Sequence, residues 1–87
     1  MRHSLIASIM DDDRIRGVDK AVILALASKA GPGGTVSMSL KEIERRSGWE
    51  RDAVIASLDR LCHSGRLRLW QRGSGRKPSL YEVFPAP

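Results

Sequence analysis

The stretch SLKEIERRSGWERDAV, residues 39–54, carries the main signal for the fold. Ser39 followed three positions later by Glu42 is a capping box, in which the serine hydroxyl accepts a hydrogen bond from the glutamate backbone and the carboxylate reaches back to the serine N–H. This pattern predicts a short helix over residues 40–46. Gly48 marks its end, because glycine readily adopts the left-handed conformation that closes a helix.

A second helix follows almost at once and is predicted over residues 51–64. Val54, Leu58 and Leu61 recur at the i, i+4 and i+7 spacing of one helix face, so they form its buried stripe. Gly65 ends this helix. Two helices joined by a short turn that contains glycine form a helix-turn-helix arrangement.

The segment before this pair supplies the centre of the domain. Residues 18–30 form a predicted helix that is apolar on nearly every face, which is typical of a helix surrounded by others. Asp19 is the expected N-cap of this helix. The glycine-rich run 31–34 ends it, and residues 35–38 alternate as a very short strand does.

The segment after the pair predicts a hairpin of two strands, residues 66–72 and 80–84, joined by a glycine-rich basic tip. Successive side chains of a strand point to opposite faces, so one face of the hairpin is apolar and the other carries charge. The expected apolar face comprises Leu67, Leu69, Tyr81 and Val83. The expected outer face carries Arg66, Arg68, Trp70 and Arg72.

These elements define the expected fold class, which is mainly α with a small β-hairpin, in the order of a winged helix-turn-helix. We expect three main helices, a two-stranded wing and a short extra helix over residues 5–10. The aspartates at 11–13 are expected to end this extra helix or to lie in a solvated turn. The predicted organisation is an N-terminal extension over 1–16, the domain over 17–84 and a tail over 85–87. The predicted core comprises Leu24, Ile43, Val54, Leu58, Leu61, Leu67 and Val83.

The charge of the chain is uneven. The net charge is +5 and the pI is about 10.1, which favours an anionic partner, and nucleic acid is the commonest one. Residues 66–77 hold five arginines and lysines and no acidic residue, whereas the first 20 residues hold four aspartates. The positive end of the molecule is therefore expected near the hairpin.

The stretch 39–54 also resembles the helix-turn-helix of winged-helix DNA-binding proteins, which read Ser, two variable residues, Glu-Ile, then Gly, an apolar residue and later a Val. The family's run into the wing is matched by Leu58, Leu61, Gly65 and Leu67. The segment GRKPSLYEV, residues 75–83, is similar to its wing ending. The resemblance covers about residues 18–84 and is strongest to short domains of phage and plasmid replication initiators, or replisome organisers, and of small transcription regulators. It implies binding to double-stranded DNA in replication or transcription control.

The resemblance makes residues 51–64 the recognition helix, which enters the major groove, and the hairpin a wing on the DNA backbone. On this helix Arg51 is placed to reach a guanine or a phosphate, Ile55 to touch a thymine methyl, and Ala56 to permit close approach. The predicted DNA-binding residues are Lys41, Arg45 and Arg46 on the first helix, Arg51, Asp52, Ile55 and Ala56 on the second, and Arg68, Arg72, Arg76 and Lys77 in the hairpin.

The acidic residues around the recognition helix leave a second function open. These residues are Glu50, Asp52 and Asp59. Carboxylates that face phosphates weaken DNA binding, although Asp59 is expected to pair with a neighbouring arginine. An apolar patch of Ile55, Ala56 and Trp70 beside these acids would suit a basic protein partner. The alternative is therefore a winged-helix module that binds protein instead of DNA.

Other classes of function lack their residues. The sequence has no Ser-His-acid combination and no phosphate-binding loop, so an enzyme is not expected. His3, Cys62 and His63 have the wrong spacing for a zinc site, and neither a metal nor another cofactor is expected. A single cysteine excludes an internal disulfide. With no apolar run near the roughly 20 residues of a membrane span, the expectation is a cytoplasmic protein.

Two further expectations concern surfaces. Trp49 occupies the apolar turn position and is expected in the core, whereas Trp70 is expected to be exposed. The apolar helix over residues 5–10 is expected to serve self-association, because the rest of the chain can complete the core. A homodimer would then bind symmetric DNA sites.

Overall fold

The computed structural model describes residues 2–74 and 76–85, so Gly75 of the predicted hairpin tip and the predicted tail at 86–87 lie outside the described residues. The described part forms four α-helices and three β-strands. The helices are α1 (Arg2–Met10), α2 (Gly17–Ala27), α3 (Leu40–Ser47) and α4 (Arg51–His63), and the strands are β1 (Thr35–Met38), β2 (Leu67–Gln71) and β3 (Ser79–Val83). None of these helices is long and apolar enough to cross a membrane.

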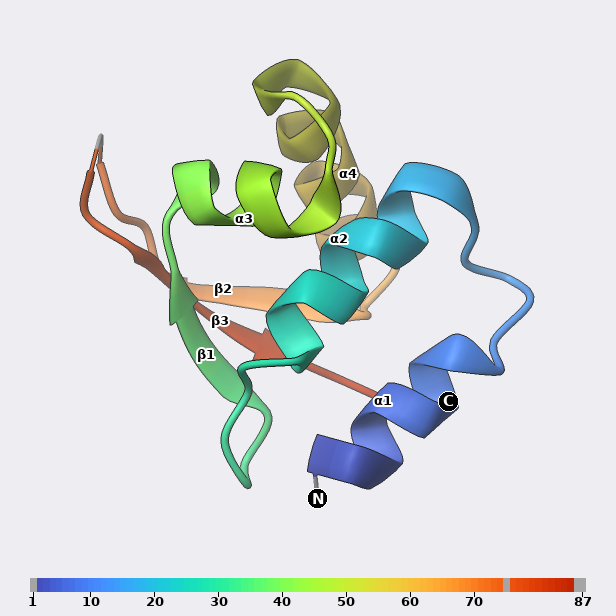
Figure 1. The fold of residues 1–87 in the computed structure, drawn as a ribbon. Coiled ribbons are helices and arrows are strands. Elements are labelled where there is room, and N and C mark those ends of the chain that lie inside the picture. The colour runs from blue at the N-terminus through green and yellow to red at the C-terminus, as the bar shows by residue number, and fades with distance from the viewer. Residues whose placement is uncertain (1, 75, 86–87) are drawn as a thin grey trace.

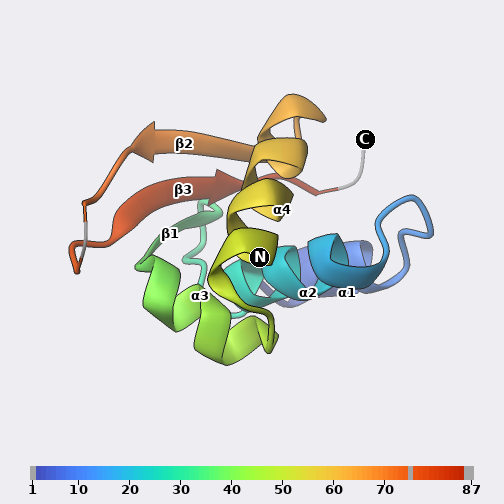
Figure 2. The same ribbon diagram turned by 90° about the horizontal axis from the view of Figure 1, so that it is seen from above.

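The three strands form one antiparallel sheet with β3 between β1 and β2 (Figure 1). Val36 of β1 lies opposite Tyr81 of β3, and Leu67 of β2 lies opposite Val83. The two-stranded hairpin expected from the sequence is thus part of a larger sheet, because the short strand after α2 pairs with the free edge of β3. The hairpin of β2 and β3 projects beyond the helices on the side away from α1 (Figures 1 and 2).

The core is built around α2, which contacts the other three helices and the sheet. Five of its eleven residues are buried. Among the residues predicted for the core, Ile43, Val54, Leu61, Leu67 and Val83 are buried. Leu24 and Leu58 are only partly buried against this core, and that prediction is wrong for them. Leu58 stays accessible because it borders a gap between α4 and the hairpin.

Helix α1 belongs to the same core. Leu5 and Ile9 are 8% and 0% exposed and pack with the buried residues of the rest of the chain. The expectation that the rest of the chain completes the core without the helix over residues 5–10 is therefore wrong. The apolar side chains assumed to be available for self-association are mostly used within the chain, and the homodimer stays a prediction.

A buried ion pair joins the turn after α1 to the start of the hairpin. Asp12 and Arg66 are 7% and 6% exposed, and the Arg66 guanidinium donates from Nη1 to Oδ2 of Asp12. Arg14 donates from Nε to the other carboxylate oxygen at 3.0 Å. Helix α1 ends at Met10, directly before the aspartates, as one of the two expectations had it. Asp12 is not solvated, however, and the prediction of an outward-facing Arg66 is wrong. Arg66 precedes β2 and turns inward because Asp12, 54 positions earlier, lies where its charge is compensated.

Hydrogen bonds from Arg14 and Arg66 hold the pKa of the Asp12 carboxyl well below its ordinary value, and burial opposes this shift only in part. The carboxylate thus stays ionised when the chain is folded, and the N-terminal turn is linked to the hairpin by charge as well as by packing.

A second ion pair links α2 to α4. Asp19 was expected to cap α2, but the N-cap is Arg16, and Asp19 lies in the first turn with its carboxylate on Arg60. Nη2 of Arg60 donates to Oδ1 at 2.7 Å, and this bond lowers the pKa of Asp19. Arg60 is therefore not available to Asp59, whose carboxylate lies 3.8 Å from His63 instead.

The capping box of α3 forms in one direction. Oγ of Ser39 accepts from the backbone N–H of Glu42 at 3.2 Å, as expected. The Glu42 carboxylate pairs with Arg46 at 2.8 Å rather than with the serine N–H. Gly48 ends the helix with a φ of 80°, the left-handed conformation that the sequence predicted.

Because α1 is part of the core, we expect truncation of the buried Ile9 side chain to lower the stability of the fold considerably. Ile9→Ala should lower the free energy of unfolding by about 2–5 kcal/mol, because it leaves a cavity against α2. Urea denaturation followed by circular dichroism measures this change in the free energy of unfolding. Met10→Ala, at a position that is 56% exposed, is the matched control and should change stability by less than about 0.5 kcal/mol. Equal small losses at both positions would show that α1 is not packed into the core.

The Asp12 pair predicts how stability depends on pH. The folded pKa of Asp12 lies below its unfolded value of about 4, so its contribution is present above that value and is lost as the pH falls through the folded pKa. From pH 6 to pH 3, Asp12→Asn should start less stable than wild type and lose stability less steeply. Asp13→Asn, which removes the adjacent exposed carboxylate, is the control. Parallel stability curves for Asp12→Asn and wild type would contradict this assignment.

Candidate functional site

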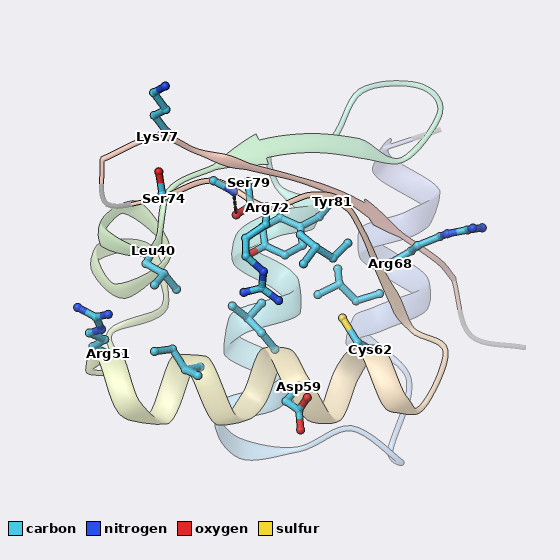
Figure 3. A pocket seen from close by; sticks show the side chains of 15 residues that line it. Leu40, Arg51, Asp59, Cys62, Arg68, Arg72, Ser74, Lys77, Ser79 and Tyr81 are labelled. Carbon is cyan, nitrogen blue, oxygen red and sulfur yellow. Dashed lines mark hydrogen bonds between the residues drawn. The ribbon is translucent and has the colours of Figure 1, made fainter.

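A groove separates α4 from the hairpin of β2 and β3 and has a volume of about 590 Å³. We call it the α4–hairpin groove. Its floor is apolar and comprises Leu40, Ile55, Leu58, Cys62 and Leu69. Its cationic lining residues include Arg51, Arg72 and Lys77. In Figure 3 the Arg72 side chain reaches from the hairpin into the space above α4, and Arg51 stands at the start of α4. The Lys77 side chain lies at the hairpin tip and points away from the groove.

A bulge in β2 directs Arg72 into this groove. Leu69 lies opposite Tyr81, but the next pair along the ladder is Gln71 opposite Leu80, so Trp70 is an extra residue on its strand. An inserted residue reverses the alternation of side chains beyond it. Arg72 therefore lies on the face toward α4, and the prediction that it shares the outer face with Arg68 is wrong.

The outer face of the sheet keeps Arg68 and Trp70. The guanidinium of Arg68 lies 4.2 Å from the centre of the Trp70 ring, and the indole N–H donates to Oε1 of Glu82 at 2.8 Å. Trp70 is 52% exposed, which confirms the prediction for this residue. Although Arg68 also borders the groove, Figure 3 shows its charged end pointing away from it. The charge of Arg68 thus faces Trp70 and Glu82, on the opposite side from Arg72.

The cations of the groove are not neutralised within the described part of the chain. None of the ion pairs formed by residues 5–74 and 76–85 involves Arg51, Arg72 or Lys77. The acid at the groove is Asp59, 76% exposed in its side chain and beside His63. The groove therefore presents more positive than negative charge to an incoming ligand.

The hairpin tip is held in a tight turn. The backbone N–H of Gly73 donates to Oγ of Ser79 at 2.8 Å, and the N–H of Lys77 donates to the carbonyl of Ser74 at 2.9 Å. A Cβ on Gly73 would lie 2.1 Å from the carbonyl oxygen of Lys77, so only glycine fits there. This turn places Arg76 and Lys77 at the exposed end of the hairpin.

The outward face of α4 matches its prediction. Asp52, Ile55, Ala56 and Asp59 are exposed, and Arg51 is exposed in the first turn. Arg51 and Ile55 also border the α4–hairpin groove, whereas Asp52 and Ala56 do not. The structure thus brings together the predicted residues Arg51, Ile55, Arg72 and Lys77.

The predicted residues of α3 lie apart from this groove. Lys41 and Arg45 border a second hollow, together with Trp49. Arg45 and Arg46 share the Glu42 carboxylate, at 3.7 and 2.8 Å, so part of their charge is compensated. Hydrogen bonding from Arg46, with the charges of its neighbours, lowers the pKa of Glu42.

Trp49 was expected in the core, and this prediction is wrong. It is 45% exposed in the turn between α3 and α4. Ile43 and Val54, on the two helices that flank the turn, are fully buried. The aromatic ring is left on the surface beside Lys41 and Arg45.

Sequence reasoning missed the groove floor. The sequence places Leu58 in the core and Leu69 on the apolar face of the hairpin, and in the structure both are only partly buried. Cys62 is likewise only partly buried. Their partial exposure arises from the separation of α4 and the hairpin, which no local pattern encodes. Among the described residues, no cluster of three or more His, Cys, Asp or Glu is arranged to hold a metal ion.

Comparison with known proteins gives one informative likeness. No protein-family model matches the chain, and no curated protein matches it. A solved structure of BpsR from Bordetella bronchiseptica, from work on the regulation of its DNA binding by 6-hydroxynicotinic acid, superposes with a TM-score of 0.61 at 17% sequence identity. The match covers 97% of this chain and 62% of BpsR, so the chain spans less than two thirds of that protein. The two proteins share a fold over this region.

The environment of Cys62 predicts slow reaction with thiol reagents. Burial raises the pKa of the Cys62 thiol, and the nearby Asp59 charge acts in the same direction, so less of the reactive thiolate is present. Iodoacetamide at pH 8 should alkylate the native protein several-fold more slowly than the urea-unfolded chain. The double variant Cys62→Ser/Ser64→Cys moves the thiol to an exposed position and should abolish this difference. Equal native and unfolded rates in wild type would contradict a half-buried thiol.

Proposed function

We propose that this chain is a winged helix-turn-helix domain that binds double-stranded DNA. In this proposal α3 and α4 form the helix-turn-helix, α4 is the recognition helix, and the β2–β3 hairpin is the wing. The observation that carries it is a set of cations that form no ion pair among the described residues, Arg51 and Arg72 at the groove and Lys77 at the adjacent hairpin tip.

The outward face of α4 suits the major groove, which is wide enough to admit a helix. Arg51 in the first turn would reach a guanine edge or a phosphate, and the exposed Ile55 would contact a thymine methyl. Ala56 keeps the backbone close to the DNA. Asp52 near the helix N-terminus would accept from a cytosine amino group or serve only the helix dipole.

Backbone contacts would come from two other places. Lys41 and Arg45 on α3 lie beside the exposed Trp49, at the point where the first helix of such a pair crosses the phosphates. Arg76 and Lys77 at the wing tip would neutralise phosphates without reading sequence. Arg46, held by Glu42, would contribute less than Arg45, and Arg68 is left out because its guanidinium faces Trp70.

The likeness to BpsR supports this proposal, because BpsR is a protein whose DNA binding is regulated by a small molecule. A role in gene regulation follows as part of the proposal, with a binding rather than a catalytic activity. None of the comparisons points to phage or plasmid replication, and that expectation stays a prediction.

The alternative of a protein-binding module rested on an apolar patch of Ile55, Ala56 and Trp70, and these residues do not lie on one surface. Ile55 borders the α4–hairpin groove, whereas Trp70 lies on the outer face of the sheet under Arg68. The two side chains therefore do not form the single apolar patch on which this alternative rested. Strongly exposed cations around the groove also favour an anionic partner over a basic one.

The two faces of the hairpin provide a matched test. Arg72→Ala and Arg68→Ala remove the same charge from the same strand region, but only Arg72 faces α4. Fluorescence anisotropy with a labelled duplex at several salt concentrations should show that Arg72→Ala reduces the slope of log affinity against log salt by about 0.9. Arg68→Ala should retain the wild-type slope.

The double variant Arg76→Ala/Lys77→Ala removes two cations at the wing tip. If both contact phosphates, it should reduce the slope of log affinity against log salt by about 1.8. Equal slopes for Arg72→Ala and Arg68→Ala would refute the proposed orientation of the wing. Absence of binding of the wild-type chain to any duplex at low salt would refute the proposed function.

A further inference from the structure

We propose that the α4–hairpin groove is also a binding site for a small organic anion with a flat apolar body. We infer further that such a ligand competes with DNA, and only this competition rests on the proposed function. The site is the cavity itself, with Arg72 above an apolar floor.

The size and lining of the groove fit such a ligand. Its volume of about 590 Å³ falls within the roughly 300–1,000 Å³ of small-molecule sites. Leu58, Cys62 and Leu69 form a partly exposed apolar floor that receives no further cover from the described part of the chain. Covering this floor with an apolar ring would remove apolar surface from water, which is favourable.

The charge arrangement specifies the sign of the ligand. The Arg72 side chain extends over the groove without a carboxylate partner among the described residues (Figure 3). A planar guanidinium presents two parallel N–H donors that match a carboxylate, a sulfonate or a similar planar or trigonal anion. Arg51, a lining residue at the start of α4, adds attraction of the same sign.

DNA alone would not cover the apolar floor of this cavity. A sugar–phosphate strand that crosses the groove would pair with the cations of the groove, but phosphates do not cover apolar side chains favourably. A ligand with an anionic end and an apolar body would use both the guanidinium and the floor. Because it would occupy Arg72, it would remove one of the cations proposed to bind phosphate.

The experiment uses a probe of this chemistry and its uncharged counterpart. The anionic dye 8-anilino-1-naphthalenesulfonate and neutral N-phenyl-1-naphthylamine share one aromatic body and differ in the sulfonate. Fluorescence titration of the full chain should show the anion binding at one site and more tightly than the neutral dye. Arg72→Ala should weaken binding of the anion by about tenfold, as expected for loss of a charge-assisted hydrogen bond, and should leave the neutral dye unchanged. Arg68→Ala is the charge-matched control and should behave as wild type.

The chain's single cysteine reports occupancy directly. Cys62 lies in the groove floor, so saturating anionic dye should slow its alkylation by uncharged iodoacetamide. Unchanged alkylation, or equal affinity of Arg72→Ala and wild type for the anion, would overturn the proposed site.

The competition is measured separately, with a labelled duplex in anisotropy. Displacement of the duplex by the anionic dye but not by the neutral dye would support it. If the dye protects Cys62 while DNA affinity is unaffected, the competition is overturned and the site stands. If the chain binds no duplex, the proposed function fails, and the dye and alkylation results still decide the site.

Discussion

The structure depends on the burial of α2, a helix with apolar residues on nearly every side. Val22, Ile23 and Leu26 are fully buried, and no single neighbour could cover them. Coverage requires α1, α3, α4 and the sheet to surround this helix, and each of them contacts it. Since burying apolar surface is the main favourable term in folding a small domain, this requirement sets where every other element lies. The position of α4 relative to the hairpin, and hence the groove between them, follows from how both pack around α2.

Charge is distributed in two distinct ways over this framework. Asp12 with Arg66 and Asp19 with Arg60 are compensated within the chain and connect elements that are far apart in sequence. Nε and Nη2 of Arg66 are buried without a hydrogen-bond partner among the described residues, so this pair contributes more to the placement of the N-terminal turn than to net stability. By contrast, Arg51 and Arg72 at the groove and Lys77 at the hairpin tip form no ion pair within the part of the chain that the structure describes. The positive charge available to a partner is therefore concentrated where α4 and the hairpin diverge.

One inserted residue in β2 connects the sheet to the proposed function. Without the bulge at Trp70, Arg72 would lie on the outer face with Arg68, and the groove would lack the guanidinium that extends over its floor. With the bulge, one face of the hairpin carries the Arg68–Trp70–Glu82 cluster, and Arg72 lies on the opposite face, toward α4. The same arrangement gives the groove both an apolar floor and a cation, the two features on which the proposed binding of an amphipathic anion and of a phosphate backbone rests.

Local patterns in the sequence were enough to predict the helices and the strands. Ser39 with Glu42, a glycine at position 48 and the stripe of Val54 and Leu61 act through neighbours one or two turns away. The exposed face of α4 followed from the same periodicity. Tertiary packing, by contrast, was needed to establish the burial of Arg66, the place of α1 in the core, the exposure of Trp49 and the direction of Arg72. Each of these depends on a partner distant in sequence or on the register of a strand, and a pattern of near neighbours contains no information about either.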